Sequence, residues 1–352
     1  MSVINRAFQC TLQTCTLDHA MVHYVPTLAG NALFLALFAI AAVIHLFLGV
    51  WYRTYSYLFA LGCGLLLEII GYAGRISLHY DPFSFNAFLQ YLICLTIAPA
   101  FICAGIYFCF GRVVIEYNGR IDASRERQRS PSRLQPGTYS KIFIACDVVC
   151  LILQSAGGAI TSTAGMSNTS LRDLGINIMI AGLACQVVSL AGFIGLAVDF
   201  AIRVRRQRAQ RPSSLPSAVW EAGWKWKAFL TCKRCPCLPP SISLIILDRY
   251  IFRPLLTQLI PQALVVATIT IFIRSCFRVA ELKGGFGSDL ANDQVAFMIL
   301  EGAMIIIACS ALTAIHPGVV FPRERWSAPA QSGLTRVASQ SSHIEMRQGP
   351  VA

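Results

Sequence analysis

The sequence predicts an all-α, polytopic membrane protein with seven transmembrane helices. Its composition is 55% hydrophobic and only 13% charged, whereas soluble domains carry roughly a quarter charged residues. Seven apolar runs each approach the roughly 20 residues that a helix needs to cross a hydrocarbon core. Because backbone polar groups cannot stay unpaired in lipid, each run must form a helix. The predicted spans are residues 31–50, 55–72, 87–110, 142–160, 175–198, 255–273 and 295–315.

The distribution of basic residues predicts the orientation of the chain. Twenty-three of the 29 Lys and Arg residues lie on one side of the predicted membrane: Arg53, seven in 111–141, eleven in 199–253 and four after His316. Since Lys and Arg mark the cytoplasmic face, the N-terminus is predicted outside and the C-terminus in the cytoplasm. The net charge of +12 is therefore a topology signal, and nucleic acid is not an expected partner.

The spans divide the chain into three regions. Residues 1–30 are predicted to form an extracellular tail, and they lack the basic and apolar segments of a signal peptide. The glycosylation sequon at Asn168 falls in a loop placed outside, which agrees with this topology. Residues 31–318 form the seven-helix transmembrane domain. Residues 319–352 are rich in Ser, Gln and Arg and are expected to be a disordered cytoplasmic tail.

The long cytoplasmic loop 199–253 differs from the other connections. Trp220, Trp224 and Trp226 lie among lysines there, a mixture typical of a helix on the inner leaflet. An unstructured linker fits the same composition equally well. In either form the loop offers a segment to which a cytoplasmic partner could bind.

Ionisable residues inside the spans are the strongest functional signal. His45, Glu68, Asp147 and Glu301 fall within spans one, two, four and seven. A charged side chain at the centre of a membrane helix costs about 2.5–3.5 kcal/mol on insertion scales. These four residues therefore need polar partners or a wet cavity.

Spacing places further polar residues on the same helical faces. Residues four and seven apart lie on one face of a helix. Each polar stripe is either a hydrogen-bonded clamp between helices or the lining of a ligand path. The candidate residues for a substrate-binding or translocation path are His45, Glu68, Tyr72, Arg75, Asp147, Gln154, Arg274, Arg278, Glu281 and Glu301.

Glycine pairs predict where neighbouring helices approach closely. Gly62 and Gly64 lie in span two, and Gly157 and Gly158 lie in span four. Small residues let helix backbones come together in a membrane. We therefore expect all four at helix contacts.

Enzyme chemistry is not expected, and neither is a metal or another cofactor. A zinc lipid hydrolase of the ceramidase or adiponectin-receptor type needs three ligands, usually with histidines grouped on facing helices. Of six histidines, only His45 is well inside a span, and His316 lies near the cytoplasmic edge of span seven. The sequence also contains no Gly-x-x-x-x-Gly-Lys-Ser/Thr phosphate loop, so no nucleotide motor is predicted.

Several short motifs follow one another along the chain. The main ones are Tyr24-Val-Pro26, Glu68-Ile-Ile-Gly-Tyr72-Ala-Gly-Arg75, Gln154-Ser-Ala-Gly157-Gly158, Arg274-Ser-Cys-Phe-Arg278-Val-Ala-Glu281 and His316-Pro-Gly318. In order and spacing the chain resembles the fungal lipid-translocating exporter family, the RTA-like seven-span proteins associated with resistance to aminosterols and sphingoid bases.

The resemblance implies transport or export of amphiphilic lipids, with lipid or drug stress tolerance as the outcome. Membrane lipids and an amphiphilic small molecule are the expected partners, and the plasma membrane is the expected location, although a vacuolar or endosomal membrane fits the same sequence. From the residues themselves, we expect Glu68, Asp147 and Glu301 to line a polar cleft that pairs with a substrate ammonium. The alternative is a heptahelical lipid or stress receptor without transport activity.

Overall fold

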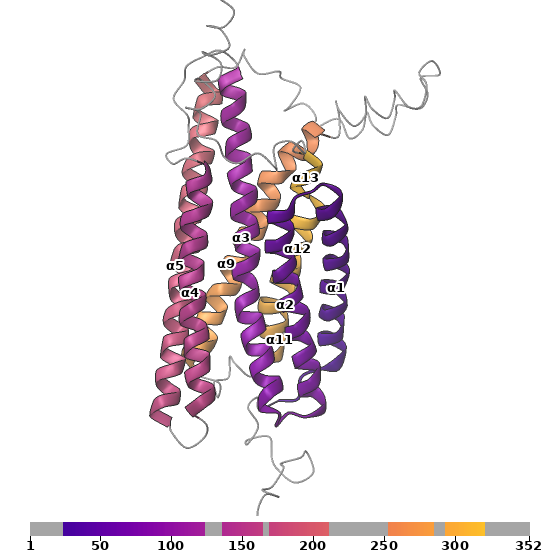
Figure 1. Ribbon diagram of the computed structural model, residues 1–352, viewed down its shortest axis with the longest axis vertical. Helices are drawn as coiled ribbons and strands as arrows, with labels where there is room; N and C mark the ends of the chain where they lie inside the picture. Colours follow the sequence, from indigo (N-terminus) through magenta and orange to yellow (C-terminus); the bar gives the residue numbers. More distant parts are fainter. Residues whose placement is uncertain (1–23, 124–135, 165–168, 211–252, 285–292, 321–352) are drawn as a thin grey trace, which may run out of the picture.

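The computed structural model describes residues 24–123, 136–164, 169–210, 253–284 and 293–320. In these ranges the chain forms helices and short connections, without a strand. The greater part of both predicted tails, the Trp-bearing part of the loop 199–253 and Asn168 lie outside them. The helices, labelled as in Figure 1, are α1 (Leu28–Trp51), α2 (Tyr55–Tyr80), α3 (Phe85–Ala123), α4 (Pro136–Ala164), α5 (Thr169–Gln210), α9 (Arg253–Gly284), α11 (Gln294–Phe297), η4 (Met298–Ala303), α12 (Met304–Ala314) and α13 (Pro317–Val320).

Seven helices of the described residues are long and apolar enough to cross a membrane, which confirms the predicted fold class. The seventh is composite, because α11, η4 and α12 follow one another without a break. Several helices run past the predicted spans: α2 continues to Tyr80, and α5 reaches Gln210. Hydropathy detects only the apolar part of a helix, so it misses the polar turns at either end.

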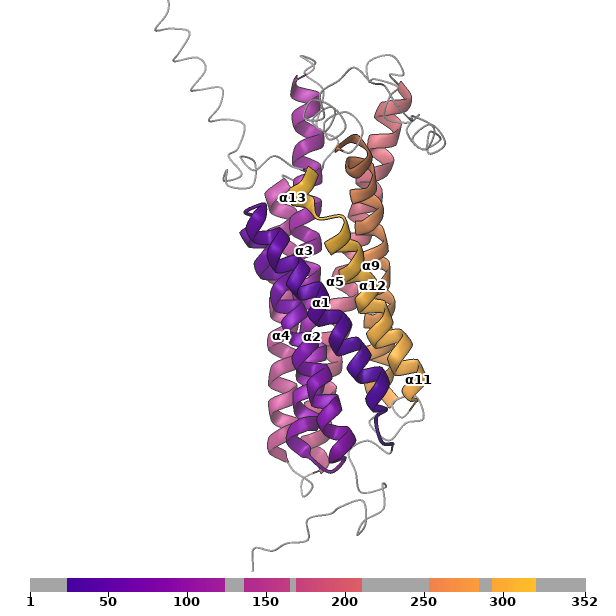
Figure 2. The ribbon, with the colours of Figure 1, turned by 90° about the vertical axis from the view of Figure 1, so that its right-hand side faces the viewer.

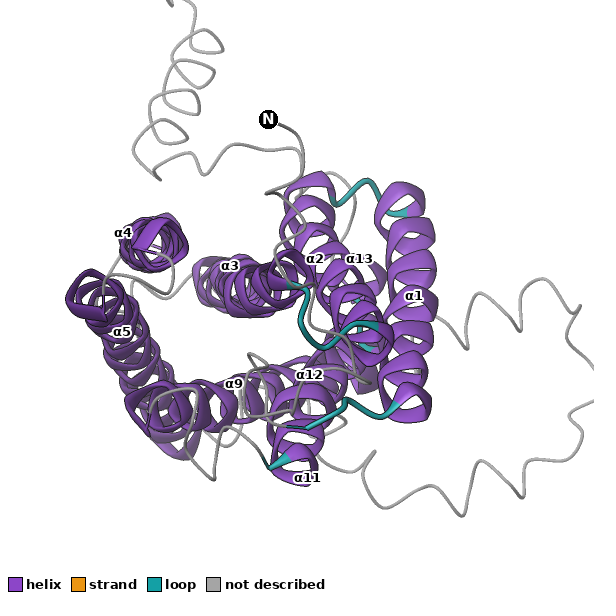
Figure 3. Cartoon of the chain, turned by 90° about the horizontal axis from the view of Figure 1, so that it is seen from below, coloured by secondary structure: helices purple, strands orange, loops and turns teal. Residues whose placement is uncertain are grey.

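The helices form a closed ring. Each packs on the next in the order α1, α2, α3, α4, α5, α9, α12, and α12 returns to α1. Helix α3 also contacts α9 across the ring. Figures 1 and 3 show the consequence: α4 and α5 stand on one side of α3, and α1 and α2 stand on the other. In Figure 2, which looks from the side of α1, α1 and α2 lie in front of α4. The α3–α9 contact thus divides the interior into two parts.

The outer surface of the ring is apolar. On α1, the side chains of Leu33, Ile40, Val43 and Phe47 are exposed, while Asn31 and His45 on the same helix are buried. A protein in water would show the reverse pattern. The arrangement is that of a bundle which faces lipid outside and buries its polar groups inside.

The glycine prediction is right at one member of each pair. A Cβ on Gly64 would lie 2.7 Å from Ile102 Cγ1, and one on Gly157 would lie 2.6 Å from the carbonyl oxygen of Gly175. Gly62 and Gly158 have no neighbouring atom within 4 Å of such a Cβ, so for them the prediction is wrong. Residues one or two apart on a helix point about 100° or 200° apart, so both members of a pair rarely meet the same neighbour.

Candidate substrate-binding core

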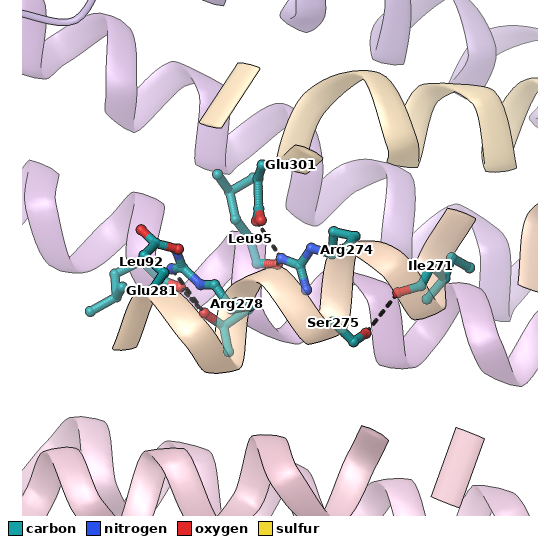
Figure 4. A network of polar contacts seen from close by, with 9 residues as sticks. Leu92, Leu95, Ile271, Arg274, Ser275, Arg278, Glu281 and Glu301 are labelled. Carbon is teal, nitrogen blue, oxygen red and sulfur yellow. Dashed lines mark hydrogen bonds and ion pairs between the residues drawn. The ribbon is translucent and has the colours of Figure 1, made fainter. Parts of the chain in front are cut away.

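Arg274 of α9 joins three helices in the buried interior. Its Nη2 donates to Glu301 Oε1 of η4 and to the backbone carbonyl of Leu95 in α3 (Figure 4). The Leu95 carbonyl is available because Pro99, four residues later in α3, has no N–H to donate to it. The arginine therefore takes the place of a hydrogen bond that the proline removes.

One turn along α9, Arg278 makes a second buried contact with α3. Its Nη1 donates to Glu281 Oε2 at 2.6 Å, and its Nη2 lies 3.4 Å from Thr96 Oγ1. Thr96 in turn donates to the Leu92 carbonyl at 2.5 Å. Figure 4 shows the two arginines side by side on α9. Arg274 and Arg278, which follow directly on the predicted sixth span, thus share one polar face of α9, as their spacing of four residues predicts, and this face points toward α3 and η4.

Glu301 lies in a short π-helix, Met298–Ala303, inside the seventh span. Such segments are rare and are frequently found at functional sites. The next residue, Gly302, lets α1 and α2 come close to it. A Cβ there would lie 2.6 Å from Tyr72 Oη and 2.8 Å from Phe34 Cζ. The glycine therefore permits η4 to place Glu301 beside the polar face of α2.

Glu68 and Tyr72 of α2 complete this cluster. Glu68 is 1% exposed, and the charges that act on it most strongly are those of Arg274, Glu301 and Arg278. Three buried oxygens have no hydrogen-bond partner among the described residues: Glu68 Oε1, Glu301 Oε2 and Tyr72 Oη. Unpaired buried acceptors are costly, so they mark a place that suits a donor. We call Glu68, Tyr72, Arg274 and Glu301 the carboxylate cluster.

Arg75 lies two turns beyond Glu68, at the end of the bundle where α1 begins. Its Nε donates to Asn31 Oδ1 at 3.1 Å, and its Nη2 donates to the Tyr24 hydroxyl at 2.9 Å. The guanidinium carbon lies 3.8 Å from the ring centroid of Phe297 and 5.2 Å from that of Tyr91. Within the described part of the chain, aromatic faces and neutral acceptors, rather than a carboxylate, stabilise this charge.

Asp147 and Gln154 lie in the other part of the ring, between α3, α4 and α5. Gln154 Nε2 donates to Gln186 Oε1 at 3.0 Å, which is the hydrogen-bonded clamp that one interpretation predicted. Both carboxylate oxygens of Asp147 are buried and lack a hydrogen-bond partner in the described part of the chain. The Tyr107 and Ser189 side chains face Asp147.

The structure therefore separates Asp147 from Glu68 and Glu301, with which it was expected to share a cleft. Cys103 of α3 lies between the two groups, within electrostatic range of both Asp147 and Arg274. The two parts of the interior are neighbours through α3. The three carboxylates are also inaccessible from the surface of the bundle, because Glu68 and Glu301 are each 1% exposed and Asp147 is 4% exposed.

His45 lies near the opposite end of the bundle, close to α13. Its ring centroid is 5.6 Å from that of His316 and 5.3 Å from that of Tyr57. Both His45 ring nitrogens and His316 Nε2 lack a hydrogen-bond partner among the residues described. Nothing in the sequence indicates this pairing, because the two histidines lie at opposite ends of the transmembrane domain in the chain. Across the described ranges, three potential metal ligands do not come together anywhere.

Sequence reasoning missed several residues of the core. Leu95, Thr96 and Asn31 act through a backbone carbonyl or a neutral side chain, so neither charge nor hydropathy identifies them. The one available signal was Pro99, because a proline within a predicted span frees the carbonyl four residues earlier. The missing information was which side chain would reach it.

Fold and core together define a class: a polytopic helical membrane protein that buries paired and unpaired charges inside a ring of seven helices. Comparison with known proteins gives the family. The model of the RTA1-like protein family matches residues 61–324, which is most of the chain. The protein therefore belongs to the RTA1-like family, as the sequence resemblance indicated.

Named relatives come from Saccharomyces cerevisiae. The sphingoid long-chain base transporter RSB1 of strain Lalvin EC1118 is 32% identical over 324 residues, which cover 88% of this chain and 76% of that protein. Protein RTA1 of strain S288c is 23% identical over 80% of each chain. Protoporphyrin uptake protein 1 of the same strain is 30% identical over 144 residues, 41% of this chain and 43% of its own. No solved structure matches the chain. Seven apolar helices and these relatives identify an integral multi-pass membrane protein.

Proposed function

We propose that the protein moves amphiphilic lipids with a cationic headgroup across the membrane, and so confers tolerance to such lipids and to similar drugs. Sphingoid bases and aminosterol-like compounds are the proposed substrates. The observation that carries the proposal is the carboxylate cluster, in which three buried oxygens near Arg274 have no hydrogen-bond partner among the described residues. The name of one yeast relative, a sphingoid long-chain base transporter, points to the same kind of substrate.

A primary ammonium suits this cluster chemically. It has three N–H donors and one positive charge, and the cluster offers Glu68 Oε1, Glu301 Oε2 and Tyr72 Oη as acceptors. Hydrogen bonds between charged groups are about twice as strong as neutral ones. In a low-dielectric interior the carboxylates attract a cation far more strongly than they would in water. The apolar tail of the lipid would remain among apolar side chains or in the membrane.

The described conformation is closed to such a headgroup, because the carboxylates are buried. Transport thus needs the helices around the cluster to separate, first toward one side of the membrane and then toward the other. For this cycle we propose the topology predicted from the sequence, with the N-terminus outside and the C-terminus in the cytoplasm. The proposed location is the plasma membrane. Asp147 and His45 lie outside the cluster and are proposed as later contacts on the same path.

Lipid movement in proteoliposomes tests the proposal. Vesicles that contain only this protein receive a fluorescent sphingoid base, and its crossing is compared with that in empty vesicles. Glu68→Gln should abolish the accelerated crossing. Asp173→Asn is the matched control, because it alters an exposed carboxylate near the start of α5. If Glu68→Gln reaches the vesicles folded and still accelerates crossing, the cluster is not the headgroup site. If the wild type binds the base but never moves it, the protein is a receptor.

A further inference from the structure

The carboxylate cluster has one negative charge more than it has positive charges. Glu68 and Glu301 are two carboxylates, and Arg274 is the one cation of the cluster. Arg278 also acts on both carboxylates, but it lies outside the cluster and is paired with Glu281. Ionising Glu68, Glu301 and Arg274 leaves a net charge of minus one inside the bundle. An uncompensated charge in a membrane interior is expensive, so the cluster needs one more cation.

Neighbouring charges in the described ranges do not supply it. Arg278 is already paired with Glu281 at 2.6 Å. Arg75 is held by Tyr24, Asn31 and the ring of Phe297, and it is not among the charges that act on Glu68.

The other titratable groups that face Glu68 are also unable to balance it. They are Tyr72 on its own helix, Cys94 of α3 and Cys309 of α12. A phenol and two thiols carry no positive charge in any protonation state. None of the described residues therefore supplies the missing cation.

We propose that Glu68, Arg274 and Glu301 hold one exchangeable cation, which is a proton when no lipid is bound and the lipid's ammonium when it is. Transport is then an exchange of one base for one proton. This inference rests on the proposed function and adds to it the source of energy.

The exchange balances in charge and in atoms. When the ammonium enters, the proton leaves the carboxyl group and passes to water on the side from which the lipid came. When the ammonium leaves on the other side, a proton from that side replaces it. Both cations compete for the same carboxylate oxygens. The cluster therefore has the same net charge whether its access changes sides with the lipid bound or with the proton bound. A proton gradient can therefore accumulate the base on the acidic side.

The test uses a lipid that cannot carry a proton itself. N,N,N-Trimethylsphingosine keeps its positive charge at every pH, whereas an ordinary amine can cross in its neutral form. Proteoliposomes are prepared with a lumen one pH unit more acidic than the outside, with valinomycin and equal potassium to hold the membrane potential at zero. At equilibrium we expect about tenfold accumulation of the probe in the lumen for each pH unit, and its loss when nigericin collapses the gradient.

Two variants remove the excess charge in different ways. Glu68→Gln and Glu301→Gln each leave Arg274 with a single carboxylate, so both should lose the accumulation. Should one of them fail to fold, the other still decides the question. Asp173→Asn, whose carboxylate is exposed, should accumulate the probe as the wild type does.

The outcomes separate this inference from the proposed function. If the wild-type protein equilibrates the probe rapidly to equal concentrations despite the gradient, proton exchange is wrong and lipid transport stands. If a sodium gradient drives accumulation and a proton gradient does not, proton exchange is wrong as well. If an ordinary sphingoid base crosses faster and the probe, which has the charge but no N–H donor, does not, charge alone does not drive the exchange and the inference is wrong, while lipid transport stands. If neither the probe nor an ordinary sphingoid base crosses faster than in empty vesicles, the proposed function fails, and the exchange with it.

Discussion

Alanine at Gly157 should destabilise the protein, while the same substitution at the next residue should not. A Cβ on Gly157 would lie 2.6 Å from the carbonyl oxygen of Gly175 and 2.7 Å from the backbone nitrogen of Met179. Both are backbone atoms of α5, so no side chain can rotate away. A Cβ on Gly158 meets no atom within 4 Å. The two sites differ in one respect, the space available.

The expected magnitude follows from that comparison. Alanine in place of glycine favours a helix by roughly 0.8–1 kcal/mol, and this gain is common to both variants. Overpacking at Gly157 adds a cost of about 1–3 kcal/mol, which is therefore also the expected difference between the two. At roughly 2–4 °C per kcal/mol, the value for domains of 150–250 residues, the Gly157→Ala protein should melt about 2–12 °C below the Gly158→Ala protein.

Fluorescence-detected size-exclusion chromatography after heating, in one detergent, measures both variants beside the wild type. Gly158→Ala should melt at or slightly above the wild-type temperature. Equal shifts for the two variants, or a larger loss for Gly158→Ala, would show that α4 and α5 do not pack as described.

Three further substitutions probe the core. Arg274→Gln leaves the buried carboxylates of the cluster without their cation, so the free energy of unfolding should fall by about 3–5 kcal/mol. Part of this stability should return in the Arg274→Gln/Glu301→Gln double variant, and a double variant that melts below both single variants would contradict the pairing. Pro99→Ala restores an N–H that can bond the Leu95 carbonyl, so sphingoid base transport should slow while the melting temperature holds, and unchanged transport would refute this role of the carbonyl. Gln154→Leu should cost only about 0.6 kcal/mol, the average for such bonds in a membrane bundle, and a loss of several kcal/mol in a urea or thermal titration would contradict it.

The helices were predictable from the sequence because lipid imposes a single rule on the backbone. Every span must be helical and apolar for about 20 residues, and hydropathy reads that rule directly. Helix ends were less predictable, as α2 and α5 show, because outside the lipid a helix no longer needs to be apolar. The hydropathy of the seventh span does not indicate the π-helix around Glu301.

The charged residues of the core were predictable for a related reason. A buried ion is costly, so Glu68 and Glu301 stand out within their apolar runs, and Arg274 stands out at the end of the sixth run. Their partners did not stand out, because contacts between distant spans depend on how the helices pack. That packing placed Asp147 in the other part of the ring and brought His45 to His316.

Charge on the lipid headgroup provides the most direct test of the central claim, that buried carboxylates select a cationic lipid. Proteoliposomes receive a fluorescent sphingoid base and, in parallel, its N-acetyl derivative, which keeps the chain and hydroxyl groups and loses the ammonium. We predict accelerated crossing of the base and no acceleration of the acetylated lipid. Equal acceleration of both would show that the carboxylate cluster does not recognise the substrate.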